Sequence, residues 1–166
     1  MAALTADRQT PCRGIVTQSE YPVVAATKIY SGGLVALNSA GFALPAADAA
    51  SHKVVGVAKK YVDNSAGANG ALKVIVETGL FELNATSITQ AMVGVVMQVV
   101  DDNTFDDVLG TNGIKAGRLV RYISATSGEI LILPSGAGVV TADATDLATA
   151  VALANALKTA VNVRIL

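Results

Sequence analysis

A loop rich in glycine and asparagine at residues 63–70 separates two valine-rich apolar runs, and it most constrains how this chain can fold. The upstream run covers 53–58. In the downstream run, 72–77, apolar residues alternate with charged ones apart from Ile75, which is typical of a β-strand with one buried face. Asp, Asn, Ser and Gly tolerate left-handed backbone or hydrogen-bond their own main chain, so the loop is a turn without catalytic side chains. The three segments predict a wide β-hairpin.

Short apolar runs separated by turn residues recur along the middle of the chain. The runs at 34–37 and 42–44 flank a turn and predict a small hairpin, and residues 87–91 can hold one short helical turn. Gly79 within a strand-like run indicates a bulge, a close backbone approach or a barrel corner. Further strands are expected at 93–100, as a buried strand, at 119–123 and at 129–133. Together these runs predict a mainly β fold, either a small β-barrel or a β-sandwich-like domain.

The two ends of the chain lack this pattern. Residues 1–20 are polar and show no sustained period, so we expect an extended N-terminal arm ahead of a β-rich core domain at 21–133. Within 134–166, an alanine-rich run up to Ala160 predicts one C-terminal α-helix. The sequence therefore predicts three parts, of which the middle one carries the core.

The expected C-terminal helix has an outer face that is small rather than charged. Thr141 or Asp143 can cap its N-terminus, and Lys158 lies in its last turn, where the helix dipole favours a cation. A helix without a strongly solvated face is covered on both sides, so we expect it, and a final strand at 161–165, to pack on the core or on a neighbouring subunit. The oligomer contacts expected on this helix are Leu147, Val151, Leu153 and Leu157.

Composition narrows the classes of partner. Apolar residues make up 52% of the chain but aromatic residues only 4%, and no run approaches the roughly 18 apolar residues of a membrane helix. The apolar surplus is better explained by subunit contacts. Twelve basic and thirteen acidic residues give a net charge of −1, with no basic cluster longer than Lys59-Lys60. We therefore expect neither a membrane nor a nucleic-acid partner.

The N-terminal residues lack the basic stretch and apolar stretch of a secretory signal, so we expect the protein to stay where it is made. The single cysteine, Cys12, excludes an intrachain disulfide and a cysteine-based zinc cluster, and we interpret it as an inert side chain in the arm. The sequon at Asn84 has no force without a secretory signal.

Few residues offer catalytic chemistry. His52 is the only imidazole, it lies in an expected surface loop, and the chain has no Gly-x-Ser-x-Gly elbow for a Ser-His-Asp system. The acidic run 101–107 could hold a hard cation, but it lacks the EF-hand pattern, so a solvated acidic turn is the favoured interpretation. The glycines at 136–138 lack the rest of a phosphate loop. We expect no catalytic residue, no metal ligand and no cofactor.

An ordered set of turns and strands carries a resemblance to a known family. Three pieces lie around the opening loop, at 54–58, 63–70 and 76–81, and four more lie at 4–8, 29–37, 99–104 and 116–120. In order and spacing this set resembles the capsid decoration proteins of tailed bacteriophages, also called cement or head-stabilising proteins. The resemblance covers residues 2 to about 133 and does not extend to the tail from Pro134.

The resemblance implies a structural virion protein that is not an enzyme. Members of the family bind the outer surface of an assembled phage head as homotrimers and clamp neighbouring subunits of the major capsid protein. An extended arm fits this role, because it can add a strand to an exposed sheet edge of a capsid protein. The residues expected to bind the capsid are Leu4, Thr5, Ala6, Asp7, Arg8 and Thr10.

Two other functions stay open at the level of sequence. A tail or fibre component of a virion would share the same β-rich composition. A small metal-dependent enzyme could use the carboxylates between Asp101 and Asp107 with a divalent ion. Locating the protein on the virion distinguishes a tail or fibre component from a decoration protein. Neutralising those aspartates distinguishes an enzyme, which would lose its activity without a change in assembly.

Overall fold

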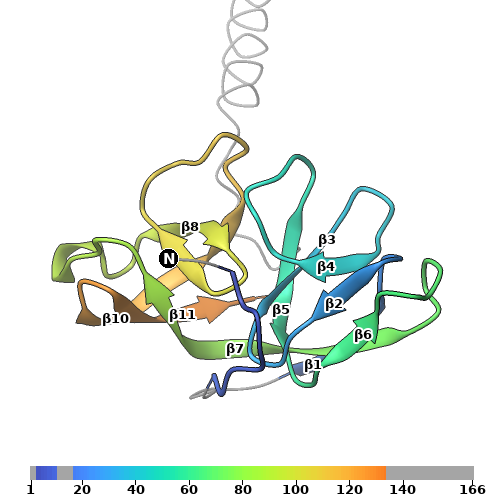
Figure 1. Ribbon diagram of the computed structural model, residues 1–166. Helices are drawn as coiled ribbons and strands as arrows, with labels where there is room; N and C mark the ends of the chain where they lie inside the picture. Colours follow the sequence, from blue (N-terminus) through green and yellow to red (C-terminus); the bar gives the residue numbers. More distant parts are fainter. Residues whose placement is uncertain (1–2, 11–16, 134–166) are drawn as a thin grey trace, which may run out of the picture.

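A computed structural model describes residues 3–10 and 17–133 of the chain. The fold over these residues is mainly β, as predicted, and Figure 1 shows its strands in two groups along the long strand β7. The strands are β1 (Thr17–Pro22), β2 (Thr27–Ile29), β3 (Leu34–Leu37), β4 (Ala43–Pro45), β5 (Lys53–Ala58), β6 (Val62–Asn64), β7 (Lys73–Ala85), β8 (Val96–Asp101), β9 (Thr104–Asp106), β10 (Lys115–Ser124) and β11 (Ser127–Ile132). Within the described residues a 3-10 turn, η1 (Gln90–Met92), overlaps the short helical turn expected at 87–91.

Five strands close into a small barrel. β7 pairs with β11, β11 with β10, β10 with β8, β8 with β9, and β9 returns to β7. The β7–β9 pair is parallel, whereas the other four pairs are antiparallel. Of the two architectures expected from the sequence, the barrel is the correct one.

The long strand β7 joins this barrel to a second group of strands, and Figure 1 shows it running beneath both. Up to Thr78 its residues pair with β1, and from Gly79 onward they pair with β11. Gly79 has a φ of 141°, which favours glycine, so β7 changes partners at a residue that can bend the strand. The barrel-corner interpretation of Gly79 therefore fits. On its other edge the first half of β7 pairs with β5, which continues to β3 and β4.

Both predicted hairpins are present, with one correction. β3 and β4 pair antiparallel around a turn in which Asn38 Oδ1 accepts the N–H groups of Ala40 and Phe42, both at 3.0 Å. β5 and β7 also pair antiparallel, but through two residue pairs only. Asp63 and Asn64, expected in the turn, belong to β6, which leaves the hairpin to pair with β2. The wide loop therefore contributes one strand, β6, to a separate two-stranded sheet with β2.

Two groups of buried side chains form the core. The larger group fills the barrel and includes Phe81, Phe105, Leu83, Met97, Leu119 and Ile130. The smaller group lies under the second set of strands and includes Val23, Ile29, Val35, Val55, Val74 and Val76. The expectation of a fully buried strand at 93–100 is wrong, because Met97 and Val99 are buried while Val95 and Val100 are exposed. This segment is half-buried because only one of its faces looks into the barrel.

Near the N-terminus the structure has a strand that the sequence did not predict. β1 begins at Thr17, inside the range expected for the arm, and all of its first four residues are exposed. This strand pairs with β7 along its whole length. The sequence did not predict it because its side chains are polar and show no alternation with apolar ones. The predicted C-terminal helix and strand, with Leu147, Val151, Leu153 and Leu157, lie outside the described residues.

Candidate functional site

The segment expected to bind a capsid, residues 4–10, lies against the core of its own chain (Figure 1, dark blue). Arg8 N–H donates to the Ser31 carbonyl oxygen at 2.8 Å, and Ser31 N–H donates to Asp7 Oδ1 at 3.0 Å. The Thr10 hydroxyl donates to the Gly32 carbonyl oxygen at 2.8 Å. Three consecutive hydrogen bonds therefore fix the second half of the segment to the turn between β2 and β3.

A second turn, between β8 and β9, holds the first half of the segment. Leu4 N–H donates to Asp102 Oδ1 at 2.9 Å, and the Arg8 guanidinium donates to Asn103 Oδ1. The Asp102 carbonyl oxygen in turn accepts Leu34 N–H at 2.6 Å, which ties this turn to the start of β3. We call the receiving surface the arm seat and define it as Ser31, Gly32, Gly33, Asp102 and Asn103.

Two adjacent glycines make room for the arm at its seat. Gly33 N–H donates to the Tyr30 carbonyl oxygen at 3.2 Å, and Gly32 has a φ of 81°, so a tight turn places a left-handed residue at this point. A Cβ atom on Gly32 would lie 2.0 Å from the Arg8 carbonyl oxygen, and one on Gly33 would lie 3.0 Å from Leu4 Cδ1. The docked arm therefore touches the bare backbone of both glycines.

Docking changes the electrostatics of two charged groups. The Asp102 residue is 3% exposed, and its burial raises the pKa of the carboxyl. The Leu4 N–H bond opposes this shift, and the negative charge of Asp101 adds to it. Burial also lowers the pKa of Arg8, partly offset by the charge of Glu82. The seat thus holds a carboxylate whose charged form is disfavoured by the loss of water.

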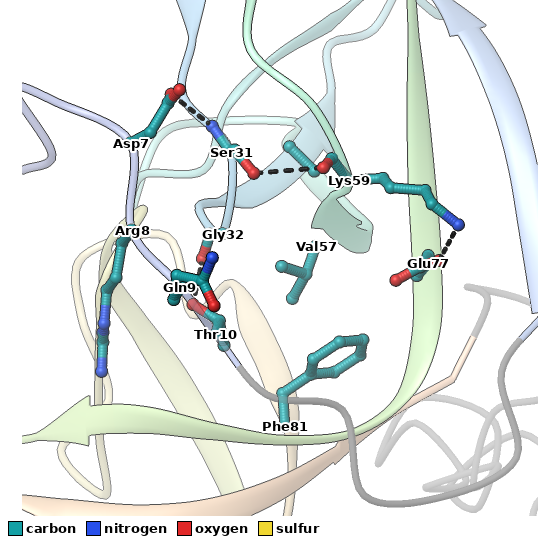
Figure 2. Close-up of a pocket in the computed structure, with 11 residues that line it drawn as sticks. Asp7, Arg8, Gln9, Thr10, Ser31, Gly32, Val57, Lys59, Glu77 and Phe81 are labelled. Atoms are coloured by element: carbon teal, nitrogen blue, oxygen red, sulfur yellow. Dashed lines mark hydrogen bonds and ion pairs between the residues drawn. The ribbon is translucent and has the colours of Figure 1, made fainter.

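Beside the arm lies a polar cleft of about 320 Å³, shown in Figure 2. One wall consists of arm residues from Asp7 to Thr10, and the other includes Lys59, Glu77 and Phe81. Lys59 Nζ lies 2.8 Å from Glu77 Oε1. Because Asp7 accepts a bond from Ser31 and Lys59 pairs with Glu77, these charged groups serve the structure of the cleft rather than face an open reaction site.

The acidic run 101–107 spans the end of β8, the turn into β9 and β9 itself, and it is not solvated throughout. Asp102 is buried in the seat, which contradicts the expected solvation. Asp101 Oδ1 accepts Asn103 N–H at 2.9 Å, and Asp106 Oδ1 accepts the N–H groups of Asp107 and Val108 at 2.7 and 3.3 Å. Over residues 3–10 and 17–133, no three metal-ligating side chains come together.

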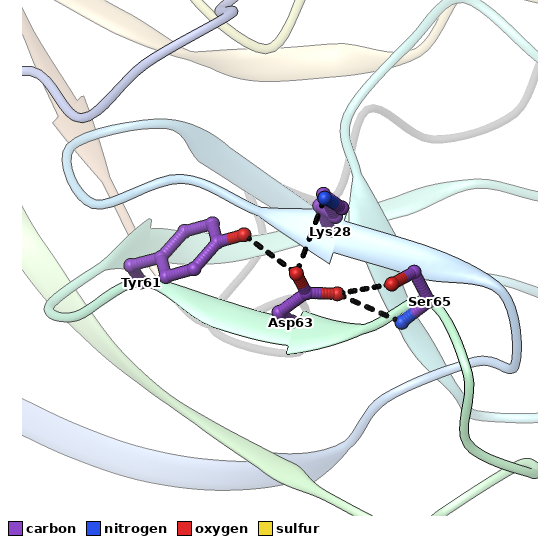
Figure 3. A network of polar contacts seen from close by, with 4 residues as sticks. All are labelled: Lys28, Tyr61, Asp63 and Ser65. Carbon is purple, nitrogen blue, oxygen red and sulfur yellow. Dashed lines mark hydrogen bonds and ion pairs between the residues drawn. The ribbon is translucent and has the colours of Figure 1, made fainter.

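The opening loop is organised by Asp63 (Figure 3). Its carboxylate accepts the N–H and hydroxyl of Ser65, lies 3.2 Å from Lys28 Nζ, and accepts the Tyr61 hydroxyl at 3.0 Å. These bonds, those of Ser65 foremost, hold the pKa of Asp63 well below its usual range. The neighbouring Asn64 is buried and donates to the carbonyl oxygens of Val24 and Ala68. All of these contacts stabilise the turn, as expected from its composition.

The sequence did not single out a set of exposed apolar residues near the barrel end. Val93 and Val95 flank Gly94, whose N–H donates to the Leu119 carbonyl oxygen at 2.8 Å, next to Val120. We call Val93, Val95 and Val120 the valine edge; their exposed fractions are 39%, 44% and 42%. They lie in strand-like runs in which the order of apolar residues does not distinguish a buried face from a solvent-exposed one. The sequence pattern therefore could not predict their exposure.

No family model, no curated protein and no solved structure matches this chain. Over the described ranges 3–10 and 17–133, none of the helical structure has the length and apolar character needed to cross a membrane.

Proposed function

We propose that this chain is a structural decoration protein, made in the cytoplasm of a bacterial host, that binds the outer surface of an assembled phage capsid. It would do so as a homotrimer that bridges neighbouring subunits of the major capsid protein. The proposal starts from the ordered resemblance along residues 2 to 133. It requires no catalytic residue and no cofactor.

The observation that carries the proposal is the binding chemistry of residues 4–10. This segment lies outside the strand ladders and makes contacts through main-chain groups and polar side chains, at Leu4, Asp7, Arg8 and Thr10. An exposed sheet edge or turn of a capsid protein offers the same kind of partner groups. A closed barrel supplies a rigid body from which such an arm can reach a neighbour.

The valine edge supports the subunit part of the proposal. Large exposed apolar side chains on a small domain favour a covering partner. A closed trimer covers them symmetrically and presents three arms at once, so weak contacts at each arm are multiplied by avidity. Leu147, Val151, Leu153 and Leu157 remain the proposed helix contacts of that trimer.

Two measurements test the proposal directly. The mass of the protein in solution should equal three chains, and the protein should co-sediment with emptied heads of the phage that carries it. Removing residues 1–10 should reduce co-sedimentation about tenfold or more, because several main-chain and side-chain hydrogen bonds of about 1 kcal/mol each are lost. The β-sheet signal in circular dichroism should stay unchanged, since the barrel strands lie outside the deletion. Undiminished occupancy of the truncated protein would exclude the arm as the capsid-binding element.

The main alternative is a tail or fibre component, and imaging the protein on the virion separates the two. Density at the three-fold positions of the head supports decoration, whereas density on the tail contradicts it. A metal-dependent enzyme would need the carboxylates of the acidic run 101–107 as ligands. Asp101, Asp102 and Asp106 instead each accept hydrogen bonds from backbone N–H groups, which disfavours that function.

A further inference from the structure

We propose that the arm seat is a binding site for the chain's own residues 4–10, and that docking in cis competes with capsid binding by the same residues. The second half of this inference rests on the proposed function. Asp7, Arg8 and Thr10 are expected to contact the capsid, yet all three already engage the seat. One set of groups cannot serve two partners at once, so the docked and capsid-bound states exclude each other.

The seat matches the arm in both main-chain and side-chain chemistry. Ser31 offers a backbone N–H to a carboxylate and a backbone carbonyl to an N–H one residue further on. Asp102 accepts a main-chain N–H, and Asn103 accepts a guanidinium. Gly33 leaves space for a leucine side chain. The site therefore fits an extended segment with a leucine followed, after two residues, by Asp-Arg, and then by a threonine two residues beyond the arginine.

Gly32 shows that the space above the seat belongs to the arm. The three atoms closest to a Cβ built on Gly32 are the Arg8 carbonyl oxygen at 2.0 Å, Thr10 Oγ1 at 2.7 Å and the Arg8 carbonyl carbon at 2.9 Å. All three belong to the arm. Two of them are backbone atoms, which cannot yield as the end of a flexible side chain does. A single methyl group at position 32 is therefore incompatible with the docked arm.

Competition has a measurable size. When only the undocked arm can bind a partner, the apparent dissociation constant equals the intrinsic one divided by the undocked fraction. Docking as weak as one net hydrogen bond, about 1 kcal/mol, already lowers capsid affinity about fivefold. A variant whose arm cannot dock should therefore bind the capsid more tightly by the same factor.

The test compares Gly32→Ala with Gly41→Ala in the full chain. The two glycines have nearly the same φ, 81° and 82°, so alanine meets the left-handed backbone penalty at both. No atom lies within 4 Å of a Cβ at Gly41, so only Gly32→Ala collides with the arm. Gly41→Ala thus controls for the cost of the backbone conformation.

Amide hydrogen exchange on the isolated proteins tests docking itself. In the wild type and in Gly41→Ala, the N–H groups of Leu4 and Arg8 should be protected by their bonds to Asp102 and Ser31. In Gly32→Ala both should exchange at the rate of an unstructured segment. Unprotected Leu4 and Arg8 amides in the wild type would overturn the seat as a binding site.

Co-sedimentation with emptied phage heads tests the competition. Gly32→Ala should bind the heads at least about fivefold more tightly than the wild type does, and Gly41→Ala should bind them as tightly as the wild type. Equal binding of all three proteins overturns the competition while leaving the proposed function in place. Absence of binding by all three overturns the proposed function and the competition with it, and the exchange data then still decide whether the arm docks.

Discussion

Asp102 shows how a single residue acquires a role that its neighbours in the sequence do not share. Four aspartates lie between positions 101 and 107, and nothing in that run distinguishes the one that becomes buried. Burial of Asp102 depends on Leu4 and Gly33, which come from distant parts of the chain. Local sequence therefore predicted the turn but not the seat, because the contact that creates the seat is not local.

Burial of Asp102 predicts an unusual dependence of stability on pH. Its pKa in the folded protein is raised, so the folded state binds this proton more readily than the unfolded state does, and this residue's contribution to stability increases as pH falls from neutral toward the ordinary carboxyl range. Asp102→Asn, which keeps an oxygen for Leu4 N–H, should be as stable as the wild type or up to about 1 kcal/mol more stable at pH 7. The difference should shrink at pH 4.5, as measured by urea unfolding.

Asp63→Asn is the control, because the contribution of Asp63 to stability should depend on pH in the opposite direction. The pKa of Asp63 is lowered in the folded protein, so its contribution is present above the ordinary carboxyl pKa and is lost as pH falls through its folded pKa. The variant should be less stable than the wild type at pH 7, and the two should converge in strong acid. Parallel pH trends for Asp102→Asn and Asp63→Asn would contradict the assignment of burial to Asp102.

The strands divide into those that local patterns predict and those that they do not. The β3–β4 hairpin was predictable because the Asn38 side chain accepts backbone N–H groups within the turn and Gly41 supplies its left-handed residue. The parallel pairing of β7 with β9 and the closure of the barrel were not, since they join segments without a connecting turn. β1 was missed because pairing with β7, rather than an apolar face, makes it a strand.

Within β5, adding a side chain at Gly56 should destabilise the fold. This glycine has a φ of 150° beside the register shift between β5 and β3, and a Cβ there would lie 2.5 Å from the Glu77 carbonyl oxygen of β7. Gly56→Ala should cost about 2–4 kcal/mol, since backbone strain and a collision between paired strands add. Gly41→Ala carries strain alone and should cost about 1–2 kcal/mol. Thermal unfolding of both variants measures the difference, and equal midpoints would show that β5 can move away from β7.

The molecule as a whole combines a closed barrel with surfaces that the barrel does not cover. Closure removes the edges of β7 and β11 in the ring, which prevents open-ended strand pairing there. The valine edge remains exposed, and so do Val108 and Leu109 in the loop after β9, at 66% and 72%. The composition alone predicted that apolar surface would be left for subunit contacts, but only the fold places part of it beside η1 and β10.

A charged substitution in the valine edge should therefore act on assembly and not on folding. Val95 is 44% exposed, so the lysine of Val95→Lys can keep its ammonium group in water, and the free energy of unfolding should change by less than about 1 kcal/mol. In a trimer that covers this edge, three buried ammonium groups have no partner, and the mass in solution should fall to that of one chain at micromolar concentration. Leu72→Lys, at the same 44% exposure but in the loop before β7, is the matched control and should leave the mass unchanged. A trimer of Val95→Lys with wild-type stability would mean that subunits meet through another surface, and the helix contacts proposed at Leu147 and Leu157 would then be the next to test.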